Sequence, residues 1–229
     1  MKKTQLVTFL RETHQTLAKR LKYLLFALIL CYSTISCAKN TQVTITSFTQ
    51  NGETACTCQI NSGEYTGASI SGDIIIADGL DIPDYAFAGN TKITSVIAAG
   101  NIGTIGKEAF RQSSAIFTFN DVRFIGEHAF YKSSEIFTFN DVRFIGEGAF
   151  RESSGDITFN NVGTIDSWAF QKRSSDVTFN DIGTIEKGAF FESQSQIYVS
   201  HQMSDTKIAK FRSPGGYKGK VKRLPKPEP

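Results

Sequence analysis

Apolar and polar residues return in the same order at a fixed interval along the second half of the chain. The pair Ala-Phe stands at positions 109/110, 129/130, 149/150, 169/170 and 189/190, so five units keep a spacing of 20 residues. An earlier copy, Ala86-Phe87, lies 23 residues before the first of these units. Segments 113–127 and 133–147 differ only at Ala115 and Glu135, which indicates an array built by duplication.

Each unit contains a segment in which every second residue is apolar. Phe117 and Phe119 flank Thr118, and the equivalent positions of the later units keep this apolar, polar, apolar order. The period of two predicts a strand with one buried face. A second apolar pair, Val122 and Ile125, predicts a further extended piece at 122–125.

The stretch Gly-x-x-Ala-Phe, as at 106–110, lacks this alternation and is too short for a full α-helix. We predict a single helical or 3₁₀ turn there, which points its Phe inward. Each unit would then form one coil, with a corner at Asn120-Asp121 between its two extended pieces. Coils stacked in parallel place equivalent residues about 4.8 Å apart and bury the Ile, Ala and Phe columns as ladders.

Polar columns at the predicted corner have two readings. Stacking would bring Asp121 and Asp141 to about 5 Å, the separation of the paired carboxylates in retaining glycosidases, and the same holds for Glu127 and Glu147. Repetition alone produces these pairs, however, and Asn and Asp are typical of turns. We therefore expect no catalytic residues, and we predict that a ladder of asparagine side chains bonds to the backbone at the corner. Its members are Asn120, Asn140, Asn160 and Asn180.

Composition supports a folded repeat array. Of the 229 residues 40% are apolar and 21% are charged, which excludes a disordered chain. Thirteen of the 19 phenylalanines stand at recurring positions of the five 20-residue units, so the array explains the excess of this residue. Residues 37–200 carry 11 basic and 19 acidic side chains, and this acidic balance argues against nucleic acid as a partner.

The repeats resemble a known family. Ile82-Pro83-Asp84-Tyr85-Ala86-Phe87 and Ile105-Gly106-Lys107-Glu108-Ala109-Phe110, with Ile97 and Ile102 between them, are similar to the BspA-like leucine-rich repeats of bacterial surface proteins. The resemblance covers about residues 74–200. It implies a repeat solenoid, a leucine-rich-repeat-like right-handed coil of short parallel β-strands and single helical turns with 20–23 residues per unit. It also implies a cell-surface protein that binds other proteins, such as host matrix proteins or the surface proteins of other bacteria.

The N-terminal segment has the layout of an export signal. Six basic residues within 2–22 precede Tyr23–Ile35, an uncharged apolar run of 13 residues. A transmembrane helix needs about 20 apolar residues, so a permanent span fits less well. We predict a signal peptide over 1–36, an N-terminal linker and cap over 37–73, repeats over 74–200, and a C-terminal cap with a basic flexible tail over 201–229.

The cysteines add two expectations. Thr34-Ile35-Ser36-Cys37 resembles the lipobox of bacterial lipoproteins, so Cys37 is the candidate for lipidation, and the alternative is a plain cleaved signal. Cys56 and Cys58 form a disulfide or stay reduced, and the sequence does not decide between these states. We expect no metal and no cofactor, because too few further ligands accompany these thiols.

The function that these patterns favour is non-catalytic binding by a surface scaffold anchored through a lipid, in the outer membrane or at the cell surface. The alternatives are a periplasmic location and a structural or assembly role in the cell envelope. Phe124 and Phe144 either face outward or pack on the flank of the solenoid. The expected binding ridge comprises Ile116, Thr118, Arg123, Phe124, Ile136, Thr138, Arg143, Phe144, Thr158, Thr178 and Tyr198.

Overall fold

A computed structural model of the chain describes residues 43–48, 54–60, 72–76 and 78–227. The chain divides into two units, Met1–Ser36 and Cys37–Pro229, and every described residue belongs to the second. Cys37 and the predicted signal lie outside the described residues.

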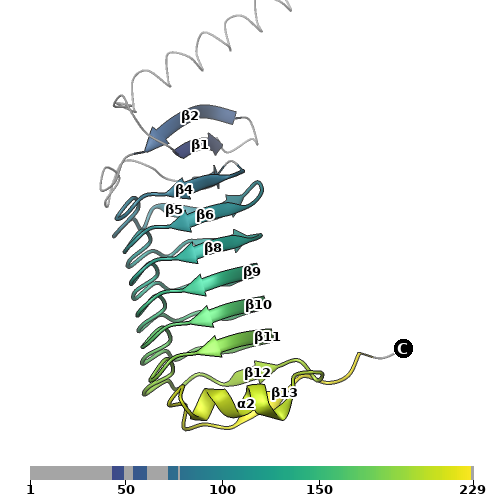
Figure 1. Cartoon of the computed structure of the whole chain (residues 1–229). Helices are drawn as coiled ribbons and strands as arrows, with labels where there is room; N and C mark the ends of the chain where they lie inside the picture. The colour runs from purple at the N-terminus through teal and green to yellow at the C-terminus, as the bar shows by residue number, and fades with distance from the viewer. Residues whose placement is uncertain (1–42, 49–53, 61–71, 77, 228–229) are drawn as a thin grey trace, which may run out of the picture. The chain divides into compact units, whose positions relative to one another are not determined.

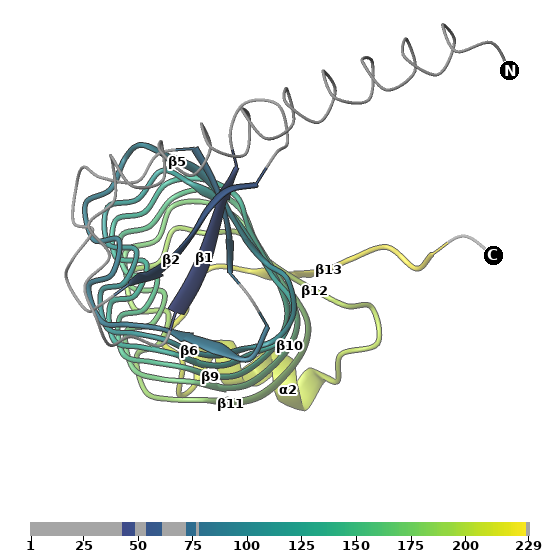
Figure 2. The ribbon, with the colours of Figure 1, turned by 90° about the horizontal axis from the view of Figure 1, so that it is seen from above.

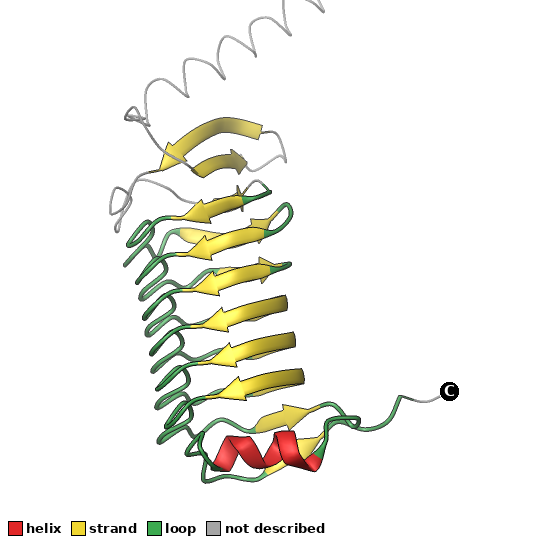
Figure 3. Cartoon of the chain, viewed as in Figure 1, coloured by secondary structure: helices red, strands yellow, loops and turns green. Residues whose placement is uncertain are grey.

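The described residues form a stack of coils that are joined by parallel strands (Figures 1 and 3). One row of strands runs β13-β12-β11-β10-β9-β7-β5-β3-β1-β2, and β4, β6 and β8 form a second row that continues into β9. The predicted solenoid is confirmed. The strands are β1 (Val43–Phe48), β2 (Thr54–Ile60), β3 (Gly72–Ile76), β4 (Leu80–Ile82), β5 (Ile93–Ala98), β6 (Ile102–Ile105), β7 (Ile116–Phe119), β8 (Val122–Ile125), β9 (Phe137–Ile145), β10 (Ile157–Ile165), β11 (Val177–Ile185), β12 (Ile197–Val199) and β13 (Val221–Arg223).

The two extended pieces of each unit lie on different sides of the coil (Figure 2). In β9, β10 and β11 the two pieces merge into one strand of nine residues that passes around the corner. Paired strands keep the predicted register, with Phe117 beside Phe137 and Val122 beside Val142. The repeat of 20 residues is therefore one full coil.

The Gly-x-x-Ala-Phe segments are tight turns, and the structure corrects the expected helical or 3₁₀ turn. The Ala109 N–H donates to the Gly106 carbonyl three residues earlier (3.3 Å), but the Phe110 N–H donates to the Ala129 carbonyl of the next coil (2.8 Å). Glu108 has a φ of 50°, the left-handed value that the third residue of a type II turn requires. A helix would direct every N–H along its own chain, whereas this segment gives alternate N–H groups to the neighbouring coil.

Phenylalanine ladders fill the centre of the stack. Phe110 and Phe130 stack with ring centroids 5.5 Å apart and 7° between the ring planes, and Phe130 and Phe150 repeat this at 5.0 Å and 6°. A second ladder, which includes Phe139, meets the first edge to face, as in the Phe139–Phe150 pair at 79°. Both arrangements are favourable for aromatic rings, at about 0.5–1.5 kcal/mol per pair beyond the buried area.

Each end of the stack has its own cover. β1 pairs antiparallel with both β2 and β3 at the N-terminal end. At the C-terminal end, α2 (Asp205–Arg212) lies against β11, and β13 pairs with β12. Ser204 caps α2, and Phe211 is buried against the rings of Phe179 (5.6 Å) and Phe190 (5.3 Å). α2 therefore closes both aromatic ladders.

Candidate binding surfaces

The outward side chains of the coil form two strand faces. The first face is the outer side of β5, β7, β12 and the N-terminal halves of β9, β10 and β11. The second face is the outer side of β4, β6, β8 and the C-terminal halves of β9, β10 and β11. The corner column, at Asn120-Asp121 and its equivalents, separates the two faces.

The first face carries most of the expected ridge. Exposed threonines stack in register with Ile97 on one side and the half-buried Tyr198 on the other. Ile116 and Ile136 are exposed by 46% and 55%, next to this column. The threonines are Thr118, Thr138, Thr158 and Thr178, of which the last is half-buried.

The second face carries the other four predicted residues. Phe124 is 37% exposed and Phe144 is half-buried, and their ring centroids lie 6.2 Å apart. Arg123 and Arg143 are exposed, and the guanidinium of Arg123 lies 5.3 Å from the centre of the Phe124 ring. We call these four residues the Arg-Phe cluster. The structure therefore places both rings at the surface and separates this cluster from the threonine column.

Gly-Thr pairs stand on both sides of the Arg-Phe cluster. Thr104 lies in register with Phe124, and Thr164 with Phe144, while the residues before these threonines are glycines. Large side chains in two adjacent coils therefore rise between smaller ones. The cluster is a local projection on an otherwise small-residue face.

The arginines of the cluster form no ion pair within the described part of the chain. Among the described residues, neither Arg123 nor Arg143 forms an ion pair, although Lys107 pairs with Glu127 at 2.9 Å on the turn side. Asp121 and Asp141 line the same shallow depression of about 440 Å³ as the two arginines without pairing to them. Two guanidinium groups thus remain available to an acidic partner.

The corner column forms a ladder of side chains, which differs from the predicted bonds to the backbone. The Asn140 amide donates to Asp121 (2.9 Å), Asn160 donates to Asn140 (3.2 Å), and Asn180 donates to Asn160 (3.2 Å). Equivalent amide side chains lie one strand spacing apart, and at this distance they can form hydrogen bonds with each other. The ladder uses Asp121 as an acceptor, which favours a structural role for this carboxylate.

One buried charge escaped sequence reasoning. Arg173 is fully buried and donates to Ser153 Oγ (2.5 Å) and to the Gly155 carbonyl. Burial lowers its pKa to about 9, and the carboxylates of Asp156 and Asp176 raise it. The signal was present in the sequence, because Arg173 replaces the serine that this column holds in the preceding units.

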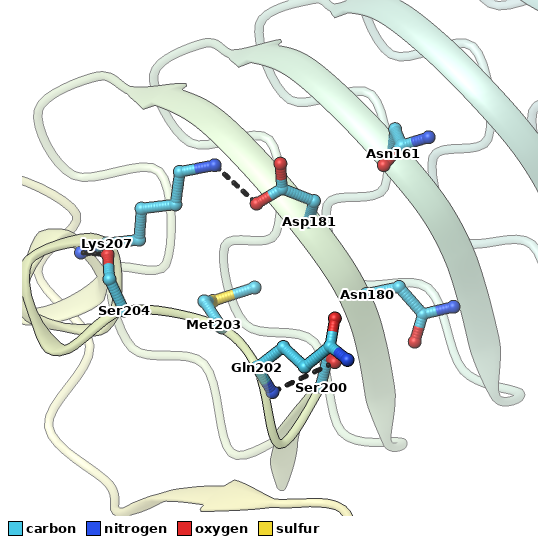
Figure 4. Close-up of a pocket in the computed structure, with 8 residues that line it drawn as sticks. All are labelled: Asn161, Asn180, Asp181, Ser200, Gln202, Met203, Ser204 and Lys207. Carbon is cyan, nitrogen blue, oxygen red and sulfur yellow. Dashed lines mark hydrogen bonds and ion pairs between the residues drawn. The ribbon is translucent and has the colours of Figure 1, made fainter.

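A polar pocket at the C-terminal end was also not predicted. It has a volume of about 460 Å³ and lies where the corner column meets the segment before α2 (Figure 4). Lys207 pairs with Asp181 at its rim (2.5 Å), and this hydrogen bond lowers the pKa of the Asp181 carboxyl. No sequence pattern marks this pocket, because residues 200–207 lie outside the repeat.

The described residues also bear on metal binding and on membrane insertion. No group of three or more His, Cys, Asp or Glu side chains lies close enough to hold a metal ion there. That same part of the chain contains no helix with the length and apolar composition needed to span a membrane.

Comparison with known proteins finds a family that matches the repeats. The model of a family described as BspA type leucine rich repeat region matches residues 80–197 in six copies. This range includes both strand faces and the Arg-Phe cluster, and it covers about half of the chain. No curated protein and no solved structure matches the chain.

Proposed function

Because the chain belongs to the BspA-type leucine-rich repeat family, we propose that it is an exported, non-catalytic adhesin that binds a protein ligand at the cell surface. Repeats of this family form scaffolds for protein interaction. The proposal specifies the surface location, the binding face and the kind of ligand.

The Arg-Phe cluster is the observation that carries the proposal. Arginine and aromatic residues are enriched among the residues that dominate binding energy at protein interfaces. Here two adjacent coils present Arg123 and Phe124, and Arg143 and Phe144, above neighbours that carry Gly and Thr. The two guanidinium groups, which have no ion-pair partner among the residues that the structure describes, favour a ligand with surface carboxylates. The rings add apolar area beside them.

Export and anchoring are the second part of the proposal. Residues 1–36 are the candidate signal peptide, and Cys37 is the candidate for lipidation. Two acyl chains on this cysteine would hold the repeats stably at a membrane. A short array gains avidity when many copies share one surface.

A replacement that uses the residues of the neighbouring units tests the binding face. In the full chain, Arg123→Gly, Phe124→Thr, Arg143→Gly and Phe144→Thr together give the second face the Gly-Thr pair of the other coils. We expect binding to an immobilised panel of matrix proteins to fall at least about tenfold, since the lost residues are of the hot-spot type. A matched control, Thr158→Ala with Thr178→Ala, changes only the first face and should retain binding. Equal binding by both variants would contradict the proposal.

Proteolysis of intact cells, with mass analysis of the mature N-terminus, tests the location. Degradation of the repeats together with an acylated Cys37 is the expected result. Full protection and an unmodified N-terminus would instead favour a structural or assembly role inside the envelope.

A further inference from the structure

The polar pocket at the C-terminal end of the array has the properties of a ligand site separate from the Arg-Phe cluster. Its volume of about 460 Å³ lies within the range of small-molecule pockets, about 300–1,000 Å³. In Figure 4 the polar side chains surround Met203, which lies at the centre of the group. The lining residues are Asn161, Asn180, Asp181, Ser200, Gln202, Met203, Ser204 and Lys207.

The hydrogen-bond ladders of the corner end at this pocket, where two amide oxygens have no donor among the described residues. Asn180 donates to Asn160, but Ser200 stands where the next coil would supply another asparagine, so the Asn180 carbonyl oxygen receives no bond from the described residues. In the adjacent column Asn161 donates to Asp141 (2.6 Å), and the next residue along is Asp181, whose ionised carboxylate has no proton to donate. Both amides are exposed to solvent.

Two serines supply donors on the other side of the pocket. Ser200 Oγ accepts from the Gln202 N–H (3.2 Å), and Ser204 Oγ accepts from the Lys207 N–H (3.3 Å). Each hydroxyl is thereby fixed in place as an acceptor while its own proton stays available to a ligand. The side chain of Gln202 adds an exposed amide with both a donor and an acceptor.

Charge and apolar contact narrow the class of ligand. Lys207 and Asp181 neutralise each other, so the pocket selects neither an anion nor a cation. Met203 is 4% exposed and gives the pocket an apolar floor without an aromatic ring. A ligand that matches must carry closely spaced groups that both donate and accept, with an uncharged C–H face.

We propose that this pocket binds a neutral carbohydrate of one or two sugar rings. Each sugar hydroxyl can donate to Asn161 or Asn180 and accept from Ser200, Ser204 or Gln202, while the C–H groups of the ring contact Met203. The site does not depend on the Arg-Phe cluster, because none of that cluster lines it.

Saturation-transfer NMR with the full chain tests this site, with maltose, cellobiose and lactose as probes. Sugar concentrations up to about 10 mM are suitable, because they nearly saturate a site with a Kd of about 1 mM. Asn180→Leu removes an open acceptor, and Gln202→Ala is a second variant at an exposed side chain. Asn140→Leu is the matched control, since it makes the same change in the same column at a distance from the pocket.

At least one of the three sugars should give a signal, and both pocket variants should weaken its binding about fivefold or more while Asn140→Leu leaves it unchanged. The variant that removes the Arg-Phe cluster should also bind the sugar normally. Absence of a signal for all three sugars would overturn the proposal, and so would equal binding by the pocket variants and the control.

Discussion

Residue by residue, the turn side shows how neighbouring coils adjust to each other. His128 and Gly148 occupy equivalent positions with φ values of 53° and 59°. A Cβ built on Gly148 would overlap the Cδ2 atom of the His128 imidazole, so the glycine makes room for the ring of the preceding coil. Trp168 and Gly188 hold the equivalent positions two coils further on, but a Cβ on Gly188 would lie 3.5 Å from the Trp168 Cδ1 atom, which is ordinary van der Waals contact.

Gly148→Ala should therefore lower the free energy of unfolding by about 1–2 kcal/mol, through its positive φ and the overlap with His128. His128→Ala in the same chain should recover the part caused by the overlap and leave the part caused by φ. Urea unfolding followed by circular dichroism measures both changes, and Glu147→Ala, at an exposed neighbour, serves as the control. Equal losses in the single and double variants would show that the ring does not contribute.

Arg173 is a second residue with a local prediction. Arg173→Leu keeps apolar volume but leaves Ser153 Oγ and the Gly155 carbonyl without their donor. The free energy of unfolding should therefore fall by about 2–4 kcal/mol. The control is Lys172→Ala, at an exposed neighbour that pairs with Glu192, and it should lower the free energy of unfolding by less than about 1 kcal/mol.

The difference in the free energy of unfolding between the native chain and Arg173→Leu should depend on pH with a definite sign. Burial lowers the folded-state pKa of Arg173 to about 9, below that of the unfolded chain. Above pH 9 the unfolded chain binds more protons at this position, so the free energy of unfolding rises with pH. The native chain should therefore gain stability relative to Arg173→Leu between pH 8 and about pH 10. A difference that shrinks over this interval would contradict the assignment.

Among the elements, α2 is held to the array by a contact that depends on pH. Lys207 lowers the pKa of the Asp181 carboxyl, and Lys210 donates to the Gly183 carbonyl beside it (2.6 Å). A lowered carboxyl pKa adds stability that is present above the unfolded value and is lost as the pH falls through the folded one.

Acidification from about pH 5 to pH 3 should therefore loosen α2 before it affects the central coils, because the unfolded Asp pKa is about 3.9. Hydrogen exchange of the α2 amides, compared with those of β9, measures this order. Asp181→Asn removes the charge and should make the protection factors of the α2 amides, which correct for the intrinsic pH dependence of exchange, nearly independent of pH over the same interval. Simultaneous opening of α2 and β9 in the native chain would contradict the prediction.

On the scale of the whole molecule, each coil bonds only to its neighbours, so a whole unit is the natural step for a change in length. Deletion of residues 133–152 removes one complete coil and joins Lys132 to Ser153. The shortened chain should stay folded with a lower thermal midpoint, since one interface is lost. Deletion of residues 133–142 removes half a coil and should abolish cooperative unfolding in circular dichroism. Similar unfolding curves for the two deletions would contradict a stack in which one whole coil is the structural unit.

The sequence predicts burial correctly where equivalent residues repeat in every unit. It does not predict hydrogen bonds whose donor and acceptor lie in different coils. Phe117, Phe119 and Val122 are buried as their period predicts, because burial depends on alternation within one strand. The turns differ from the prediction because the Phe110 N–H has its partner in the next coil, which a local pattern does not reveal.

The candidate site follows the same rule. The threonine column could be predicted to face outward from its alternation, whereas the sequence left open whether Phe124 faces outward or packs on the flank. The separation of these residues onto two faces depends on the corner between Phe119 and Val122. The C-terminal pocket depends on residues 200–207 lying beside β11, and this contact joins segments of unrelated sequence. Its position could be found only from the folded chain.

The turns that give alternate N–H groups to the neighbouring coil have a mechanical consequence. Strand pairs on two sides of the coil and the N–H groups of the turn, such as that of Phe110, join each coil to the next around most of its perimeter. Tension along the stack is then shared by many bonds that are loaded together, whereas tension on a chain end detaches one coil at a time. At the C-terminal end, peeling must detach β13 from β12 and then extract the buried rings of Tyr217 and Phe211 before it reaches the last coil.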